Sequence, residues 1–350
     1  MESTETQVNA EETEVKAEET EVKPESSTDS ENKGKKPSKA GKIILRIAVI
    51  FIIANVILML PVASFVEVMV LKGKGNREIT QEESMREWML NELGLDTVAY
   101  ETKYRMGTFD IPSSVNNGYS IPVFYFSPEG ESKGFVVMAH GMNSSHIGIY
   151  EEAELFLEEG FEIYSFDERK FGESTWEYMS YGYYEGADVA DVFRFACENS
   201  PAEGLKGIWG QSLGGAACEN ALDDQIVMAN LDFVVLDCPM GGMDELTGAP
   251  EIQNELAGKF NKLICGYSFE QQSPYKQIMK NSAPALLVLA KDDTVIPEKS
   301  IKKIKEYFEL TVPTTVYESE GSKHADVVVD DKEGYRQALK GFLDSLESKE

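Results

Sequence analysis

The chain has 350 residues, of which 42% are hydrophobic, and a formal net charge of −28 at pH 7. This acidity excludes nucleic acid as a main partner, because binding to phosphates requires a surplus of lysine and arginine. The four cysteines are widely spaced and include no Cys-x-x-Cys pair, so the sequence predicts neither a zinc site nor a dense disulfide framework.

The first segment, residues 1–41, is a tail rich in acidic and basic residues. It contains almost no large apolar side chains, and its sequence EETEVKA at 11–17 recurs as EETEVKP at 18–24. A segment with so little apolar surface to bury is expected to be disordered. We interpret it as a solvated tether.

Residues 43–71 are predicted to form a transmembrane helix with its flanks. The stretch 47–66, IAVIFIIANVILMLPVASFV, carries no charge, and Pro61 is a candidate position for a kink. Twenty helical residues span about 30 Å, the thickness of a bilayer's hydrocarbon core. The sequence therefore predicts a single membrane anchor for this chain.

The charges on either side of this stretch predict its orientation. Six basic residues precede it within 33–46, whereas three follow it within 72–77. The positive-inside bias then places the N-terminus in the cytoplasm and the globular part outside the cell membrane. A signal peptide cleaved near 62–64 is the alternative, although the leader before the apolar stretch is longer than a usual n-region.

From residue 79 to 350 the sequence reads as one globular domain in which strands and helices alternate. Strands are expected at 103–111, 119–127, 134–140, 161–167, 205–210, 231–237, 284–290 and 314–319. Helices are expected at 146–160, 185–201, 214–229, 298–309 and 331–347. The first two strands form a hairpin around the turn at 116–118. The rest predict an α/β fold with a mostly parallel, doubly wound sheet.

A cap insertion, 238–283, interrupts this alternation between two expected strands. Its apolar side chains could line a substrate pocket or attach the cap to the domain, and the sequence favours neither role. They are Met240, Met243, Phe260, Leu263, Ile264, Tyr267 and Phe269.

Ser212 is the candidate nucleophile. It lies in GQSLGG (210–215), directly after an expected strand and directly before an expected helix. A serine on such a sharp turn needs small neighbours, which Gly210 and Gly214 provide. The helix N-terminus would also direct the Leu213 N–H toward an oxyanion at the serine.

A serine needs a base, and the chain has only three histidines. His324 lies in a loop before the last helix, where it can reach the carboxyl edge of the sheet, and is the expected base. His140 begins HGMNSS, in which the N–H of Met142 would be the second oxyanion donor. His146 is expected to face solvent.

The acid that orients the base could lie at the end of either of two expected strands. Asp293 follows the strand 284–290 in AKDDTVIP and preserves the chain order Ser, Asp, His, so it is the first choice. Asp292 is its neighbour and the local alternative. Asp237, at the end of 231–237, is the fallback.

Together these segments resemble the α/β-hydrolase superfamily, and most closely its membrane-anchored bacterial hydrolases related to serine aminopeptidases and acyltransferase-like esterases. The motifs that carry the resemblance are HGMNSS (140–145), FDERKFGES (166–174), YGYYEGADV (181–189), GQSLGG (210–215), LAKDDTVIP (289–297) and GSKH (321–324). The resemblance implies Ser212 as nucleophile, Asp293 as acid, His324 as base, and the amides of Met142 and Leu213 as the oxyanion hole.

The chain departs from the family pattern at two positions. Lys170 stands where the Asp-x-Arg-Gly loop has glycine, and Gln211 precedes the serine where His or Glu is commoner. Neither change removes a reacting group.

The expected activity is carboxylic ester hydrolysis on a small-molecule or acyl-ester substrate, without a metal or organic cofactor. A serine aminopeptidase and an acyltransferase or thioesterase are alternatives with the same machinery. The alternative outside the enzymes is a non-catalytic binding module on the same fold.

Overall fold

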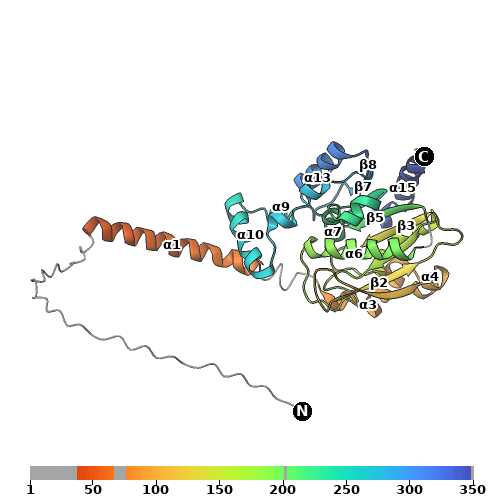
Figure 1. Cartoon of the computed structure of the whole chain (residues 1–350), viewed down its shortest axis with the longest axis horizontal. Helices are drawn as coiled ribbons and strands as arrows, with labels where there is room; N and C mark the ends of the chain where they lie inside the picture. The colour runs from red at the N-terminus through yellow and green to blue at the C-terminus, as the bar shows by residue number, and fades with distance from the viewer. Residues whose placement is uncertain (1–37, 67–75, 201–202, 348–350) are drawn as a thin grey trace, which may run out of the picture. The chain divides into compact units, whose positions relative to one another are not determined.

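The structure is a computed structural model that describes residues 38–66, 76–200 and 203–347 (Figure 1). The predicted tail, 1–41, therefore lies outside the described residues except for its last four positions. The chain divides into two units, 1–53 and 54–350, and each is described by itself.

Helix α1, Lys39–Val66, contains the uncharged stretch predicted to cross a membrane. The side chains of 57–58 and 60–66, including the candidate kink at Pro61, lie outside the described residues. Among the residues that are described, no helix combines the length and the hydropathy of a membrane span.

The second unit is built on a sheet of eight strands in the order β1-β2-β4-β3-β5-β6-β7-β8. The β1–β2 and β2–β4 pairs are antiparallel, and the other pairs are parallel. This topology confirms the predicted edge hairpin and the mostly parallel sheet. The strands are β1 Gly107–Pro112, β2 Ser120–Phe126, β3 Gly134–Ala139, β4 Glu162–Phe166, β5 Leu205–Gln211, β6 Phe233–Asp237, β7 Ala285–Ala290 and β8 Thr314–Ser319.

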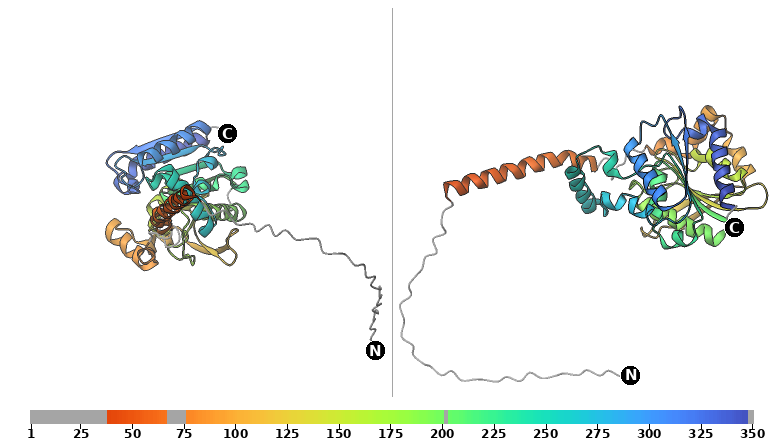
Figure 2. Two further views of the ribbon diagram at one scale, coloured as in Figure 1. Left: turned by 90° about the vertical axis from the view of Figure 1, so that its left-hand side faces the viewer. Right: turned by 90° about the horizontal axis from the view of Figure 1, so that it is seen from above.

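Helices cover both faces of the sheet, as Figure 2 shows. On one face, Phe156 of α5 and Leu339 of α15 are buried in the first apolar cluster. On the other face, Phe193 of α6, Ala217 of α7 and Phe308 of α13 are buried in the second. These helices are α5 Tyr150–Glu158, α6 Tyr183–Asn199, α7 Leu213–Ala221, α13 Glu298–Thr311 and α15 Lys332–Glu347.

Three helices that the sequence did not predict precede the sheet: α2 Arg77–Thr80, α3 Glu82–Leu93 and α4 Thr97–Lys103. Met89 of α3 is fully buried in the first apolar cluster. The Arg77 guanidinium donates hydrogen bonds to the carbonyls of Lys170, Ser174 and Trp176, at 2.6 to 2.9 Å. The segment is thus an integral part of the domain.

The cap insertion forms four helices, α9 Met243–Leu246, α10 Glu251–Cys265, α11 Phe269–Gln272 and α12 Tyr275–Ile278, of which only α10 is longer than four residues. The seven apolar side chains considered for it divide into two groups. Four are buried in a third apolar cluster, namely Met240, Met243, Tyr267 and Phe269. Three are exposed on α10, namely Phe260, Leu263 and Ile264. The buried group attaches the cap to the domain.

Candidate active site

Ser212 forms the turn between β5 and α7. Its φ of 52° and ψ of −109° lie in a region that residues with a side chain rarely adopt. A Cβ at Gly214 would lie 2.1 Å from the Ala139 carbonyl oxygen, and one at Gly210 would lie 2.3 Å from the Gly214 carbonyl oxygen. Glycine at both positions therefore allows β3, β5 and α7 to approach closely enough to hold this turn.

The structure brings three predicted residues together at the carboxyl edge of the sheet. The Nε2 atom of His324 lies 2.8 Å from Ser212 Oγ, and its Nδ1 atom lies 2.7 Å from Asp293 Oδ2. With the proton on Nδ1 donated to the carboxylate, Nε2 is free to accept the serine hydroxyl proton. Along the chain, His324 lies 112 residues from Ser212 and 31 residues from Asp293.

Asp293 is held as a carboxylate. Its Oδ1 atom accepts hydrogen bonds from the backbone N–H groups of Val295 and Ile296 at 2.7 and 2.9 Å. Burial opposes its ionisation, but the hydrogen bonds from His324 and Ile296 outweigh burial and keep the pKa of Asp293 below its ordinary value. The group therefore carries a negative charge beside the imidazole across the neutral pH range.

The other two acid candidates are placed differently. Asp237, at the end of β6, is fully buried, and burial raises its pKa to about 6. Asp292 is exposed. Among the described residues, only Asp293 of the three is hydrogen-bonded to His324.

The two predicted oxyanion amides flank the serine. Leu213 is the first residue of α7, so its N–H has no carbonyl one turn earlier in the helix to bind. A Cβ at Gly141 would lie 3.5 Å from Ser212 Cβ, so the backbone leading to Met142 passes beside the nucleophile. The side chains of Met142 and Leu213 both pack in the third apolar cluster.

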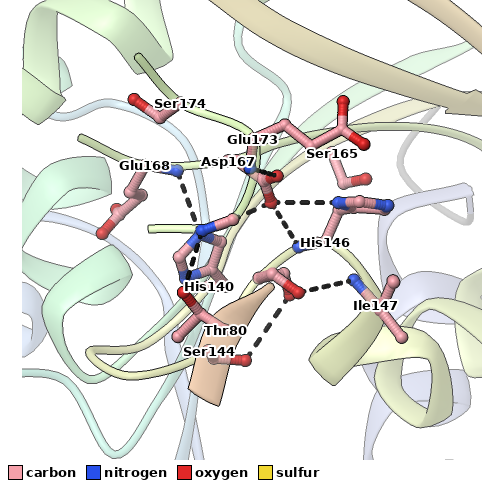
Figure 3. A network of polar contacts seen from close by, with 12 residues as sticks. Thr80, His140, Ser144, His146, Ile147, Ser165, Asp167, Glu168, Glu173 and Ser174 are labelled. Carbon is pink, nitrogen blue, oxygen red and sulfur yellow. Dashed lines mark hydrogen bonds and ion pairs between the residues drawn. The ribbon is translucent and has the colours of Figure 1, made fainter. Parts of the chain in front are cut away.

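The loop that carries Met142 is fixed by a buried polar network (Figure 3). The Nε2 atom of His140 accepts a hydrogen bond from the Glu168 N–H at 3.0 Å, and its Nδ1 lies 2.8 Å from the Gly141 carbonyl oxygen. Burial lowers the pKa of His140, which favours the neutral ring with its proton on Nδ1. His140 is therefore a positioning residue at the base of the loop.

The prediction that His146 faces solvent is wrong. Its ring is buried and stacks on Phe124 with centroids 3.3 Å apart. Its backbone N–H and its Nδ1 lie 2.7 and 3.0 Å from Asp167 Oδ1. Burial opposes ionisation of Asp167, but the charge of His146 and its hydrogen bond outweigh burial and lower the Asp167 pKa. The two residues anchor the far end of the oxyanion loop.

The family departure at Lys170 is accommodated in the backbone. Lys170 has a φ of 78°, so a lysine adopts the left-handed conformation for which glycine is favoured. Gly172 in the same loop cannot be replaced, because a Cβ there would lie 2.1 Å from Asp167 Oδ2. The loop thus retains the glycine that contacts the network.

Gln211, the residue before the serine, is hydrogen-bonded to Glu152, a buried acid that the sequence analysis did not identify. Its Nε2 donates to Glu152 Oε1 of α5 at 2.9 Å. Burial, with a smaller contribution from Asp237, raises the pKa of Glu152 to about 8. No motif marks this residue, since it is one acid among several in the helix 146–160.

A cavity of about 610 Å³ adjoins the loops of the site. It lies among α3, α5 and the short helix α14, Val327–Asp330. Met85 and Trp88 of α3 line it, and so do Gln211 and Glu152. The seven cap side chains considered from the sequence do not line this cavity.

One group of metal-ligand types occurs among the described residues, consisting of Cys238, Asp293 and His324, whose ligand atoms lie within 4.8 Å of one another. Two of the three already bind each other in the serine–histidine–aspartate array. Burial raises the pKa of the Cys238 thiol well above its ordinary value, whereas metal binding needs the thiolate. The donor set therefore fits a metal poorly.

A family model described as serine aminopeptidase, S33, matches residues 130–312, which is more than half of the chain. The chain belongs to this family. Within the curated proteins it is 28% identical over 256 residues to the uncharacterized protein YqkD of Bacillus subtilis, with 68% of this chain and 79% of that protein covered. The family assignment makes the protein a hydrolase.

Solved structures similar to this family member share its fold. The Pyrococcus furiosus esterase Pf2001 aligns with a TM-score of 0.56 at 17% identity, over 69% of this chain and 93% of that one. The α/β hydrolase GrgF from Penicillium sp. sh18 aligns with a TM-score of 0.53 at 16% identity, over 69% and 98%. These likenesses show that the domain has the α/β-hydrolase fold.

Proposed function

We propose that the protein is a serine hydrolase that cleaves carboxylic esters through an acyl-enzyme on Ser212. The observation that carries this proposal is the array in which His324 bridges Ser212 Oγ and Asp293 Oδ2 at 2.8 and 2.7 Å. The strained turn at Ser212 and the two backbone amides beside it support the same reading.

In the proposed reaction, His324 Nε2 accepts the Ser212 proton while Oγ attacks the ester carbonyl carbon. The carbonyl oxygen becomes an oxyanion that accepts hydrogen bonds from the Met142 and Leu213 N–H groups. The tetrahedral intermediate collapses, and the imidazolium of His324 gives its proton to the departing alkoxide. Water, deprotonated by the same imidazole, then hydrolyses the acyl-enzyme to release the acid.

Hydrolysis of a substrate panel tests this proposal. Wild type is expected to hydrolyse an activated acetate ester with burst kinetics, and Ser212→Ala is expected to lose the burst. Ser114→Ala, an exposed serine distant in sequence, is the matched control and should retain it. Faster turnover of an amino-acid anilide or a thioester than of any ester would instead favour the peptidase or the thioesterase assignment.

We also propose that the stretch 47–66 attaches the enzyme to the cell membrane with the hydrolase domain outside. The support is its lack of charge over twenty residues and the excess of basic residues on its N-terminal side. Protease treatment of intact cells should degrade the domain and spare an epitope tag at the N-terminus. Recovery of the full chain in the soluble fraction would contradict the proposal.

A further inference from the structure

The 610 Å³ cavity contacts three of the loops that form the site. Its lining includes Asn143, Gln211 and Ala325, which are the chain neighbours of Met142, Ser212 and His324. Its volume falls within the range of about 300–1,000 Å³ that is usual for small-molecule sites. The cavity therefore borders the chain positions next to the nucleophile, the base and the oxyanion loop, although Ser212, His324 and Met142 do not themselves line it.

The outer wall of the cavity belongs to a segment that the family model does not include. Ile79, Met85 and Trp88 come from α2 and α3, whereas the family match begins at residue 130. Any selectivity from this wall thus comes from helices outside the family match.

This wall is fastened to the site. The Asn76 N–H donates to Asn143 Oδ1 at 2.7 Å, and Thr80 Oγ1 accepts from the Gly172 N–H at 3.0 Å. Together with the three hydrogen bonds of Arg77, these contacts fix α2 against the oxyanion loop and the loop at 167–174. The cavity is therefore a preformed feature.

The lining combines apolar walls with acidic groups. Met85, Trp88, Leu93 and Val328 supply apolar surface. Glu92, Asp326 and Asp330 are exposed carboxylates in the lining, and the described lining includes no lysine or arginine. Such a cavity accommodates an apolar group that is neutral or cationic and disfavours an anionic one.

The position of the cavity indicates which part of a substrate it receives. In the proposed reaction, His324 protonates the departing oxygen, so the leaving group lies on the side of this residue. The cavity wall includes Ala325 and Asp326, directly after His324, and continues along α14. We propose that this cavity binds the alcohol portion of the ester, and that the enzyme selects apolar alcohols without negative charge. The inference rests on the proposed serine hydrolase function.

Trp88→Ala tests the apolar wall, with acetate esters of alcohols of increasing length as probes. It should lower kcat/KM for octyl acetate by about ten-fold and leave methyl acetate within about two-fold, because only the longer alcohol contacts the indole. Leu90→Ala is the matched control, because Leu90 is an exposed residue of α3 outside the cavity lining. Ser84→Trp, which adds bulk at the lining, should also reduce the preference for octyl acetate.

The charge preference has its own test. Acetate esters of 6-(trimethylammonio)hexanol and of 6-hydroxyhexanoate differ mainly in terminal charge. Wild type should prefer the cationic ester by about ten-fold at low salt, and the double variant Asp326→Asn with Asp330→Asn should reduce that ratio to about three-fold. Equal rates for the two esters in wild type would overturn this part of the inference.

The outcomes separate this inference from the function on which it rests. If Ser212 does not react with a fluorophosphonate, the hydrolase proposal fails. If Ser212 reacts but Trp88→Ala and Ser84→Trp leave the dependence on alcohol length unchanged, only the pocket assignment fails. If the two variants instead change the dependence on acyl length in a series of methyl esters, the cavity receives the acyl group and the leaving-group assignment is overturned.

Discussion

The loops at the carboxyl edge of the sheet and the cap insertion both border Ser212, but they are stabilised in different ways. The loops are fixed by directional contacts, such as those of His324 with Asp293 and of His146 with Asp167. The cap combines hydrogen bonds, such as that from Gln272 Nε2 to the Tyr181 carbonyl oxygen at 2.7 Å, with apolar packing of residues such as Met243 and Phe269. The His324–Asp293 and His324–Ser212 contacts lie in the loops, so we expect the loops to carry the chemistry and the apolar packing of the cap to contribute mainly stability.

The largest expected effect is a fall in kcat on substitution of Asp293, which lies in one of the loops. Asp293→Asn should reduce kcat by about 10⁴-fold, because the amide no longer holds the imidazole in the productive tautomer. Stopped-flow hydrolysis of an activated ester measures the change. The adjacent exposed Asp292→Asn is the matched control and should stay within about two-fold of wild type. A loss confined to Asp237→Asn would show that the acid has been misassigned.

A core truncation in the cap should affect stability and spare the chemistry. Phe269 is 3% exposed, so Phe269→Ala should lower the free energy of unfolding by about 3–5 kcal/mol. Leu263 is 82% exposed, and Leu263→Ala should change it by no more than about 0.5 kcal/mol. Urea denaturation measures both. A large fall in kcat for folded Phe269→Ala would mean that the cap shapes the site directly.

The anchor of the oxyanion loop should give an intermediate effect. Asp167→Asn weakens the hydrogen bonds to His146, so the Met142 amide is held less accurately and kcat should fall by about 10²-fold. KM should change little, because the amide acts mainly on the transition state. Asp110→Asn, an exposed position on β1, serves as the control. An unchanged kcat would show that the network is not needed to position the loop.

Glu152 should make stability depend on pH. Its pKa is raised from 4.5 to about 8 in the folded state, so between these values the folded protein binds a proton that the unfolded chain does not. Stability is therefore highest at the acidic end of this window and falls as pH rises, by about 2 kcal/mol between pH 6 and pH 7.5 for this group.

Glu152→Gln should remove that contribution while keeping an acceptor for Gln211. Urea denaturation at the two pH values, compared with the exposed Glu83→Gln, isolates the effect. Equal pH dependence in wild type and Glu152→Gln would contradict the assigned protonation of this acid.

The sequence could predict the groups that local motifs and chain order specify. Ser212 follows a strand and precedes a helix within a glycine-rich turn, and His324 and Asp293 occupy the expected loops. The structure places His324 within hydrogen-bonding distance of both other residues. The parallel strands were equally predictable, because buried strands appear as continuous apolar runs.

What the sequence could not predict depends on contacts between distant segments. The burial of His146 results from Phe124 and Asp167, which lie 22 and 21 residues away along the chain. The cavity beside α3 depends on helices 77–93 packing against a domain whose family motifs begin later. No local pattern marks Met85 or Trp88 as lining residues.

The most direct test of the central claim is reaction with a fluorophosphonate, followed by intact-mass measurement and peptide mapping, on wild type and His324→Ala. We predict one adduct in wild type, on the peptide that contains Ser212, and none in the folded variant under the same conditions. Folded wild type without an adduct, or with its adduct on another serine, would contradict the assignment of Ser212 as a nucleophile activated by His324.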